Sequence, residues 1–312
     1  RRRRRPEATR VFTCLSHDVI VHETTHALLD ALRDRYMDPS TPDQGAFHEG
    51  FADVVALLSV FALPEVVEHL LSLGQHTPGD VPTISRANVM PDALCRSALF
   101  GLAEEMGQAL QGVRGAPLRA SAEIVPSPTL KDTPEFLEPH RRGELFVAAV
   151  LRGFIAAWSA RVLSSGTEGQ RHFPVRRVAE EGANVADTLV TMWIRAIDYM
   201  PPVHLEYGDA LSAALTADYE VRPDDSRYEL RRHTLDAFAS FGFAPASNRT
   251  MPAHIWMPPP PGLKYDRVRF DSMRSDEDEV FRFIWDNREI LKLADGAFTQ
   301  VLSVKPSVRI GI

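Results

Sequence analysis

The sequence predicts a mainly α-helical protein, α+β overall, with a small α/β appendage at its C-terminal end. Apolar residues recur at helical spacing along most of the chain, whereas alternating strand patterns are scarce before residue 265. The 312 residues are 44% apolar and 25% charged, and no internal repeat is visible. These values are ordinary for a globular protein, so they exclude collagen, coiled coil and wholesale disorder.

The main domain is expected to occupy residues 1–245 and to consist of a series of helices. One irregular connection interrupts the series, because Gly112–Pro139 carries five prolines. Connections of this length are often functional. The predicted helices cover residues 17–36, 47–61, 64–73, 91–111, 143–163, 176–199, 208–218 and 228–240.

The end of the chain is predicted to be organised differently. Residues 246–262 form a Pro-rich linker, and residues 263–312 form the small α/β segment. In that segment we expect a helix over Asp276–Leu291, which begins with acidic residues. β-like segments follow near Phe298–Val304 and Val308–Ile312.

The charge of the chain argues against a nucleic-acid partner. Lys and Arg total 35 against 42 Asp and Glu, and the first ten residues already hold six of the arginines. The rest of the chain is therefore acidic, and a run such as Arg1–Arg5 is usually solvated rather than a binding site. The two cysteines, Cys14 and Cys95, cannot build a disulfide framework and favour a reducing, cytoplasmic compartment.

Neither a targeting segment nor a membrane span is expected. No apolar stretch precedes the polar residues Ser16–Asp18, so we expect no secretory signal, although a chain that does not open with Met suggests a fragment or a processed form. Leu145–Leu163 reaches the length of a membrane span and is apolar apart from Arg152, Ser159 and Arg161. A central arginine favours a buried core helix over a span.

The first predicted helix contains the pattern His-Glu-Thr-Thr-His at residues 22–26. At about 100° per residue, His22 and His26 lie about 40° apart on one helical face, so their imidazoles can converge on one ion. Glu23 projects at the edge of that face. This is the geometry of a catalytic zinc site, and a chance match on a polar helix face is the alternative. Because catalytic zinc usually takes three protein ligands, a third must come from elsewhere.

The second predicted helix supplies a candidate for the third ligand. Residues 47–61 are apolar nearly all round, so this helix should be buried, yet Glu49 and Asp53 lie one turn apart on it. Two buried carboxylates cost several kcal/mol unless they are paired, and zinc and an imidazole N–H are suitable partners. We therefore assign Glu49 as the third ligand and Asp53 as the acceptor that orients one histidine. The alternative is a Glu49 favoured by the helix dipole and a solvated Asp53, which fits Asp53 poorly.

These two motifs resemble those of a known family. The segments His-Glu-Thr-Thr-His-Ala at 22–27 and Ala-Phe-His-Glu-Gly-Phe-Ala-Asp at 46–53 resemble the gluzincin metallopeptidases, closest to the thermolysin-like branch. The match covers about residues 16–62. It implies a zincin/gluzincin-like helical domain in which His22, His26 and Glu49 bind Zn²⁺. His48 departs from the asparagine that usually precedes the glutamate ligand.

The resemblance also implies a mechanism and a peptide or protein substrate. Zinc would acidify its bound water, and Glu23 would act as general base, passing the water proton to the departing amine. Asp53 would hold His22. The family's oxyanion donors are a histidine at a later helix start and often a tyrosine after the second zinc histidine.

Two histidines are candidates for the oxyanion donor. His140 precedes Gly143 at a predicted helix start, one residue short of the family's spacing, and its order in the chain fits. His204 matches the local spacing to Gly208 better but comes late in the chain. Tyr36, ten residues after His26, is a candidate second donor or a tyrosine that packs a helix end.

Three functions therefore remain open at this point. The first is a zinc endopeptidase. The second is a zinc aminopeptidase, although the Gly-x-Met-Glu-Asn loop of that family is absent from the sequence. The third is a non-catalytic, zinc-stabilised binding or structural domain, because only 21 residues precede His22 and the family's β-rich lobe needs more.

Overall fold

The computed structural model describes residues 17–38, 40–72, 81–96, 121–167, 169–246, 254–297, 299–301 and 304. The chain divides into two compact units, residues 1–247 and 248–312, and each is described by itself.

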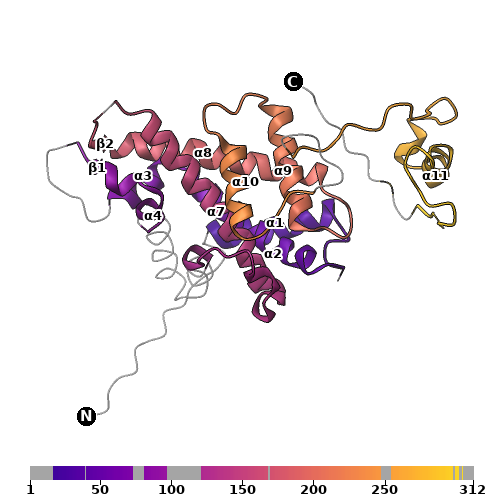
Figure 1. The fold of residues 1–312 in the computed structure, drawn as a ribbon, viewed down its shortest axis with the longest axis horizontal. Coiled ribbons are helices and arrows are strands. Elements are labelled where there is room, and N and C mark those ends of the chain that lie inside the picture. Colours follow the sequence, from indigo (N-terminus) through magenta and orange to yellow (C-terminus); the bar gives the residue numbers. More distant parts are fainter. Residues whose placement is uncertain are drawn as a thin grey trace, which may run out of the picture. The chain divides into compact units, whose positions relative to one another are not determined.

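The first unit is mainly helical, as the sequence predicts (Figure 1). Its strands pair antiparallel, with Ile84 opposite Phe173, and form a short ribbon that the sequence analysis does not predict. The helices are α1 (His17–Leu32), α2 (Pro42–Phe61), α3 (Pro64–Ser72), α4 (Pro91–Leu94), α7 (Pro139–Ser164), α8 (Val175–Ala196), α9 (Tyr207–Val221) and α10 (Leu230–Ser240), and the strands are β1 (Thr83–Ser85) and β2 (His172–Pro174). Short 3₁₀ segments cover Arg86–Val89, Leu130–Asp132, Pro134–Leu137 and Ile197–Tyr199.

Several helix boundaries differ from the prediction because of local capping. α2 begins at Pro42, five residues early: the Thr41 side chain accepts a hydrogen bond from the Gln44 N–H, and proline is well tolerated in the first turn. α7 begins at Pro139 for the same kind of reason, with Glu138 as its cap. α1 ends at Leu32 instead of residue 36.

Some predictions fall wholly or partly outside the described residues. Of the helix expected over 91–111, the structure describes α4 and residues 95–96. Of the irregular connection Gly112–Pro139, it describes the part from residue 121, which contains two 3₁₀ segments. Residues 299–301 and 304 are not in a strand, which corrects the β-like segment near Phe298–Val304 where it is described. The segment Val308–Ile312 lies outside the described residues.

α7 forms the centre of the first unit. Its Phe146 ring contacts the rings of Phe47 on α2, Trp193 on α8, Tyr207 on α9 and Phe238 on α10. By length and hydropathy α7 could cross a membrane, and so could α2 and α3 taken together across their 81° bend. However, 78% of the apolar window of α7 is buried inside the protein, which is how a core helix also behaves.

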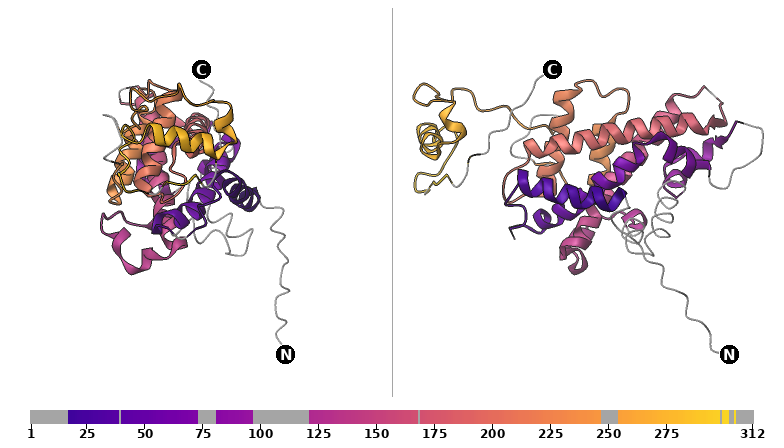
Figure 2. Two further views of the ribbon diagram at one scale, coloured as in Figure 1. Left: turned by 90° about the vertical axis from the view of Figure 1, so that its right-hand side faces the viewer. Right: turned by 180° about the vertical axis from the view of Figure 1, so that it is seen from behind.

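The helices α1 and α2 lie side by side in the first unit (Figure 2), and α2 also crosses the start of α7. At this crossing two glycines meet. A Cβ on Gly50 would lie 2.9 Å from the carbonyl oxygen of Gly143, and a Cβ on Gly143 would lie 3.1 Å from the carbonyl oxygen of Ala46. Side chains at either position would push the helices apart, so the glycines bring the first turn of α7 next to Glu49.

The second unit contains the helix α11 (Glu277–Asp286), shorter than the predicted Asp276–Leu291, and a 3₁₀ turn at Ser272–Arg274. The Asp276 carboxylate caps α11 by accepting from the Asp278 and Glu279 N–H groups. Asn287 is buried and exchanges two hydrogen bonds with the backbone of Lys264, which fixes the segment before α11 against its end.

Candidate metal centre

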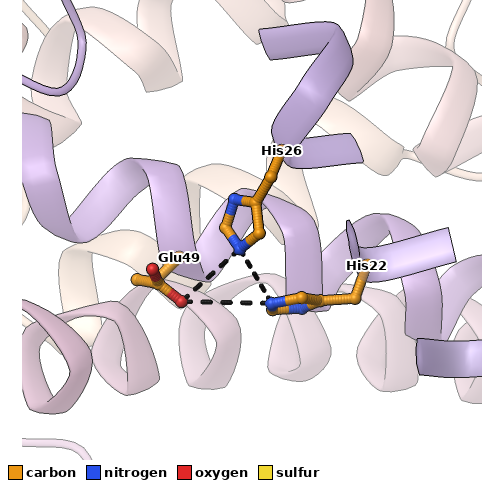
Figure 3. Close-up of side chains that lie close together, drawn as sticks. All are labelled: His22, His26 and Glu49. Atoms are coloured by element: carbon orange, nitrogen blue, oxygen red, sulfur yellow. Dashed lines mark hydrogen bonds and ion pairs between the residues drawn. The ribbon is translucent and has the colours of Figure 1, made fainter. Parts of the chain in front are cut away.

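The three predicted metal ligands converge between α1 and α2 (Figure 3). His22 and His26 extend from successive turns of α1, and Glu49 extends from α2 toward them. His22 is buried, and the other two are partly exposed. Nε2 of His22 lies 2.8 Å from Nε2 of His26 and 4.0 Å from Oε2 of Glu49. Nε2 of His26 lies 3.7 Å from the same oxygen.

These separations suit a single metal ion. A triangle with the three measured sides has a circumradius of about 2.1 Å, so one point lies at that distance from both nitrogens and the oxygen. Zinc binds histidine nitrogen and carboxylate oxygen at about 2.0–2.2 Å. Two histidines and one glutamate are also a donor set that catalytic zinc uses, with a further position left for water. The residues present therefore fit Zn²⁺.

Asp53 lies one turn after Glu49 on α2, behind the His22 ring. Its Oδ1 is 2.8 Å from Nδ1 of His22, which is hydrogen-bond distance, although the alignment of the two groups is poorer than a hydrogen bond requires. A carboxylate at Nδ1 favours the proton on that nitrogen and leaves Nε2 free to bind a metal. Asp53 thus occupies the position that the sequence predicts for it.

The electrostatics of the cluster favour neutral imidazole at His26. Burial is the largest effect that lowers the pKa of His26, and the neighbouring His22 lowers it further, while Glu49 and Glu23 oppose the shift. Neutral imidazole is the form that binds a metal. Glu23 itself is exposed, at the edge of the helical face that carries the two histidines.

His48 supports the cluster in a way that the sequence analysis missed. Its buried ring stacks on the ring of His26, with the planes 8° apart and the centroids 4.6 Å apart. Nε2 of His48 lies 2.9 Å from Oδ1 of Asp30, which holds the ring from α1. A signal for this contact exists in the sequence, because Asp30 follows His26 by one helical turn and His48 directly precedes Glu49.

Of the two histidines considered as oxyanion donor, the structure brings His140 to the cluster. Its Nε2 lies 4.0 Å from Oε1 of Glu49, and its Nδ1 lies 2.7 Å from Oε1 of Glu138. The side chain is 73% exposed, so it is accessible to a substrate. The hydrogen bond to Glu138 is the largest effect that raises the pKa of His140, with a smaller contribution from Glu49. The protonated ring is a donor at both nitrogens.

His204 lies elsewhere. It is exposed, has a left-handed backbone with φ of 54°, and precedes Leu205, whose N–H donates to the Gln44 side chain near the start of α2. Among the residues that the structure describes, no hydrogen bond or ion pair joins His204 to the three converging side chains.

Tyr36 is a packing residue, which is the alternative that the sequence left open for it. Its side chain is fully buried against Phe47, and its hydroxyl donates to the carbonyl oxygen of Pro201 at 2.8 Å. Burial also raises the pKa of Tyr36 well above its ordinary value. With its proton engaged inside the core, this hydroxyl is not presented to the cluster.

A second polar cluster, the Asp43–Arg142–Tyr207 network, lies at the N-terminal ends of α2, α7 and α9. The Asp43 carboxylate pairs with the Arg142 guanidinium and accepts a hydrogen bond from the Tyr207 N–H at 2.8 Å. The Arg142 guanidinium also donates to the carbonyl oxygens of Lys131 and Phe136. The Tyr207 hydroxyl donates to the backbone carbonyl oxygen of Arg142. The network joins the starts of α2, α7 and α9, and so it holds His140 in register with Glu49.

The chain was compared with protein-family models, curated proteins and solved structures. No protein-family model, curated protein or solved structure matches the chain. Function must therefore be inferred from the geometry of the site.

Proposed function

We propose that this protein is a zinc-dependent metallopeptidase with a gluzincin-like pair of helices, in which His22, His26 and Glu49 hold Zn²⁺. One observation carries the proposal: the two imidazole nitrogens and the carboxylate oxygen share a point about 2.1 Å from each, the bond length of zinc to these atoms. The position of Asp53 at Nδ1 of His22 supports the same interpretation.

Each surrounding side chain takes a defined part in peptide hydrolysis. A zinc ion bound there would supply an acidified water and a Lewis acid for the scissile carbonyl. Glu23, exposed beside the ligands and not one of them, takes the water proton and delivers it to the departing amine. His140 is exposed, and in its protonated form, which the hydrogen bond to Glu138 favours, it donates a hydrogen bond from Nε2 to the developing oxyanion.

Two variants test this function together. Metal content per chain is measured by plasma mass spectrometry on protein purified without chelator, for the wild type and for Glu49→Ala. We expect about one zinc per chain in the wild type and markedly less in the variant. Hydrolysis of N-acetylated and free peptides is then measured for the wild type and for Glu23→Gln. Glu23→Gln should retain the metal and lose cleavage by about 100-fold or more.

A matched control removes the same charge elsewhere. Glu65→Gln, at an exposed position on α3, should cleave at the wild-type rate. Cleavage of blocked peptides would support an endopeptidase, whereas cleavage of free peptides alone would support an aminopeptidase. Zinc binding that stabilises the protein without hydrolysis of any peptide would reduce the chain to a zinc-stabilised binding domain. A well-folded wild type without metal would overturn the proposal.

A further inference from the structure

The helix α7 carries one partly buried charge whose role is not explained by the metal centre. Arg152 lies in the middle of the apolar stretch Leu145–Leu163, and arginine stays protonated in proteins. Within the described ranges its guanidinium has a single acceptor, the carbonyl oxygen of Ile124 at 3.0 Å, and no carboxylate at ion-pair distance. By contrast, Arg142 near the start of this helix has a carboxylate and two carbonyl partners.

Arg152 lines a cavity. The cavity has a volume of about 540 Å³ and is bounded by α4, the segment 121–126, α7 and α10, which packs along α7 (Figure 1). Its apolar wall includes Leu151, Ile155 and Ala237. Volumes of about 300–1,000 Å³ with an apolar wall and a few placed polar groups are typical of small-molecule sites.

The other charges around the cavity restrict what it can hold. Burial raises the pKa of Cys95, so the thiol stays neutral and brings no negative charge. The carboxylates of Asp92 and Asp236 are at exposed positions, and Asp236 is already within 3.6 Å of the Arg232 guanidinium. Arg96 and His233 also line the cavity: Arg96 is at an exposed position, and burial lowers the pKa of His233. The two carboxylates at the rim offset the charge of Arg96 and disfavour a multiply charged anion, whereas the partly buried Arg152 guanidinium favours one negative charge with a planar fork of two oxygens.

We propose that this cavity is a second ligand site, which binds a monocarboxylate with an apolar tail: the carboxylate pairs with Arg152, and the tail lies against Leu151, Ile155 and Ala237. A partly desolvated guanidinium without an anion is costly, and a carboxylate removes that cost by accepting two charge-assisted hydrogen bonds. The apolar wall then contributes in proportion to the tail area that it covers. The site is separate from the residues that bind the metal.

Binding of decanoate to the 312-residue chain tests the proposal by isothermal titration calorimetry. Decanol, which has the same tail without the charge, and a decyl trimethylammonium salt, with the opposite charge, are the comparison ligands. We expect saturable decanoate binding, weaker binding of decanol and none of the cation. Arg152→Gln should weaken decanoate binding by about 10- to 100-fold, the value of a charge-assisted pair.

Two further variants separate charge from volume. Arg176→Gln removes the same charge at an exposed position on α8 and should bind decanoate as the wild type does. Ala156→Phe keeps Arg152 but fills part of the cavity, so it should weaken decanoate and decanol alike. The proposal is overturned if decanoate shows no saturable binding, if decanol binds as tightly, or if Arg152→Gln leaves the decanoate affinity unchanged in a folded protein.

Discussion

Two polar clusters on the same helix, α2, differ in how their atoms are satisfied. In the Asp43–Arg142–Tyr207 network, both carboxylate oxygens of Asp43 have donors, and the guanidinium of Arg142 reaches a carboxylate and two carbonyl oxygens. In the converging cluster, Nε2 of His22, Nε2 of His26 and Oε2 of Glu49 face one another, and among the described residues the buried Nδ1 of His26 finds no hydrogen-bond partner. Both clusters join helices, but only the first is complete within the chain.

The difference shows how a buried polar group can be assigned to folding or to ligand binding. A buried polar group that finds all its partners in the chain lowers the cost of its own burial and fixes the packing around it. Polar atoms that are buried together with too few donors raise the free-energy cost of burial. A bound cation lowers that cost. The first network therefore belongs to the stability of the fold, and the second cluster to its proposed function.

The largest expected effect comes from breaking the complete network. Asp43→Ala leaves the buried Arg142 guanidinium without its carboxylate and should lower the free energy of unfolding by about 3–5 kcal/mol. Urea denaturation of the metal-free protein measures it. Glu49→Ala, the matched carboxylate deletion six residues along α2, should change the same quantity by about 1 kcal/mol or less, because that side chain is partly exposed. Equal losses of unfolding free energy in Asp43→Ala and Glu49→Ala would contradict the difference drawn between the two clusters.

A smaller effect is expected at His48, whose ring stacks on the proposed metal ligand His26. His48→Ala removes the ring stacked on His26 and should weaken zinc binding by about 10- to 100-fold, as loss of a group that orients a ligand does. Competition with a chromophoric chelator measures the affinity. His48→Phe keeps a flat ring stacked on His26 and should lose less zinc affinity than His48→Ala. If His48→Phe binds zinc as weakly as His48→Ala does, the contact with Asp30 rather than ring stacking positions His26.

The smallest expected effect concerns the tyrosine that the structure places in the core. Tyr36→Phe deletes one hydrogen bond, to the carbonyl oxygen of Pro201, and should cost about 0.5–1.5 kcal/mol of stability. Peptide hydrolysis by the folded variant should keep the wild-type kcat. A large fall in kcat at unchanged stability would return Tyr36 to the list of oxyanion donors.

Much of the helical architecture follows from apolar periodicity, since the core faces of α2, α7 and α8 are long and continuous. The boundaries depend on caps, and one cap was visible in the sequence: Thr41 followed by Pro42 is a typical helix start. The β1–β2 ribbon was not predictable in the same way. Its strands have three residues each and gain their hydrogen bonds from a partner almost ninety positions away.

The candidate site was predictable where its spacing is local. Residues 22–26 and 49–53 each share one helical face, so the geometry of a single helix places the two histidines together and the two carboxylates together. Their convergence was expected because buried carboxylates need partners. The choice between His140 and His204 depended on how three helices cross, which no local pattern contains. His48 was missed although Asp30, one turn after His26, offered a signal for its contact with α1.

The glycine contact between α2 and α7 has a consequence for how well the proposed site can withstand change. Because backbone meets backbone at Gly50 and Gly143, the distance between the α2 and α7 backbones beside Glu49 and His140 is limited by hard contact. Substitutions elsewhere in the core can be absorbed by repacking without altering this spacing. Alanine at either glycine would move the two helices by tenths of an ångström, a displacement comparable with the tolerance of a metal–ligand bond. A side chain at either glycine therefore acts on the distance between Glu49 and His140 directly.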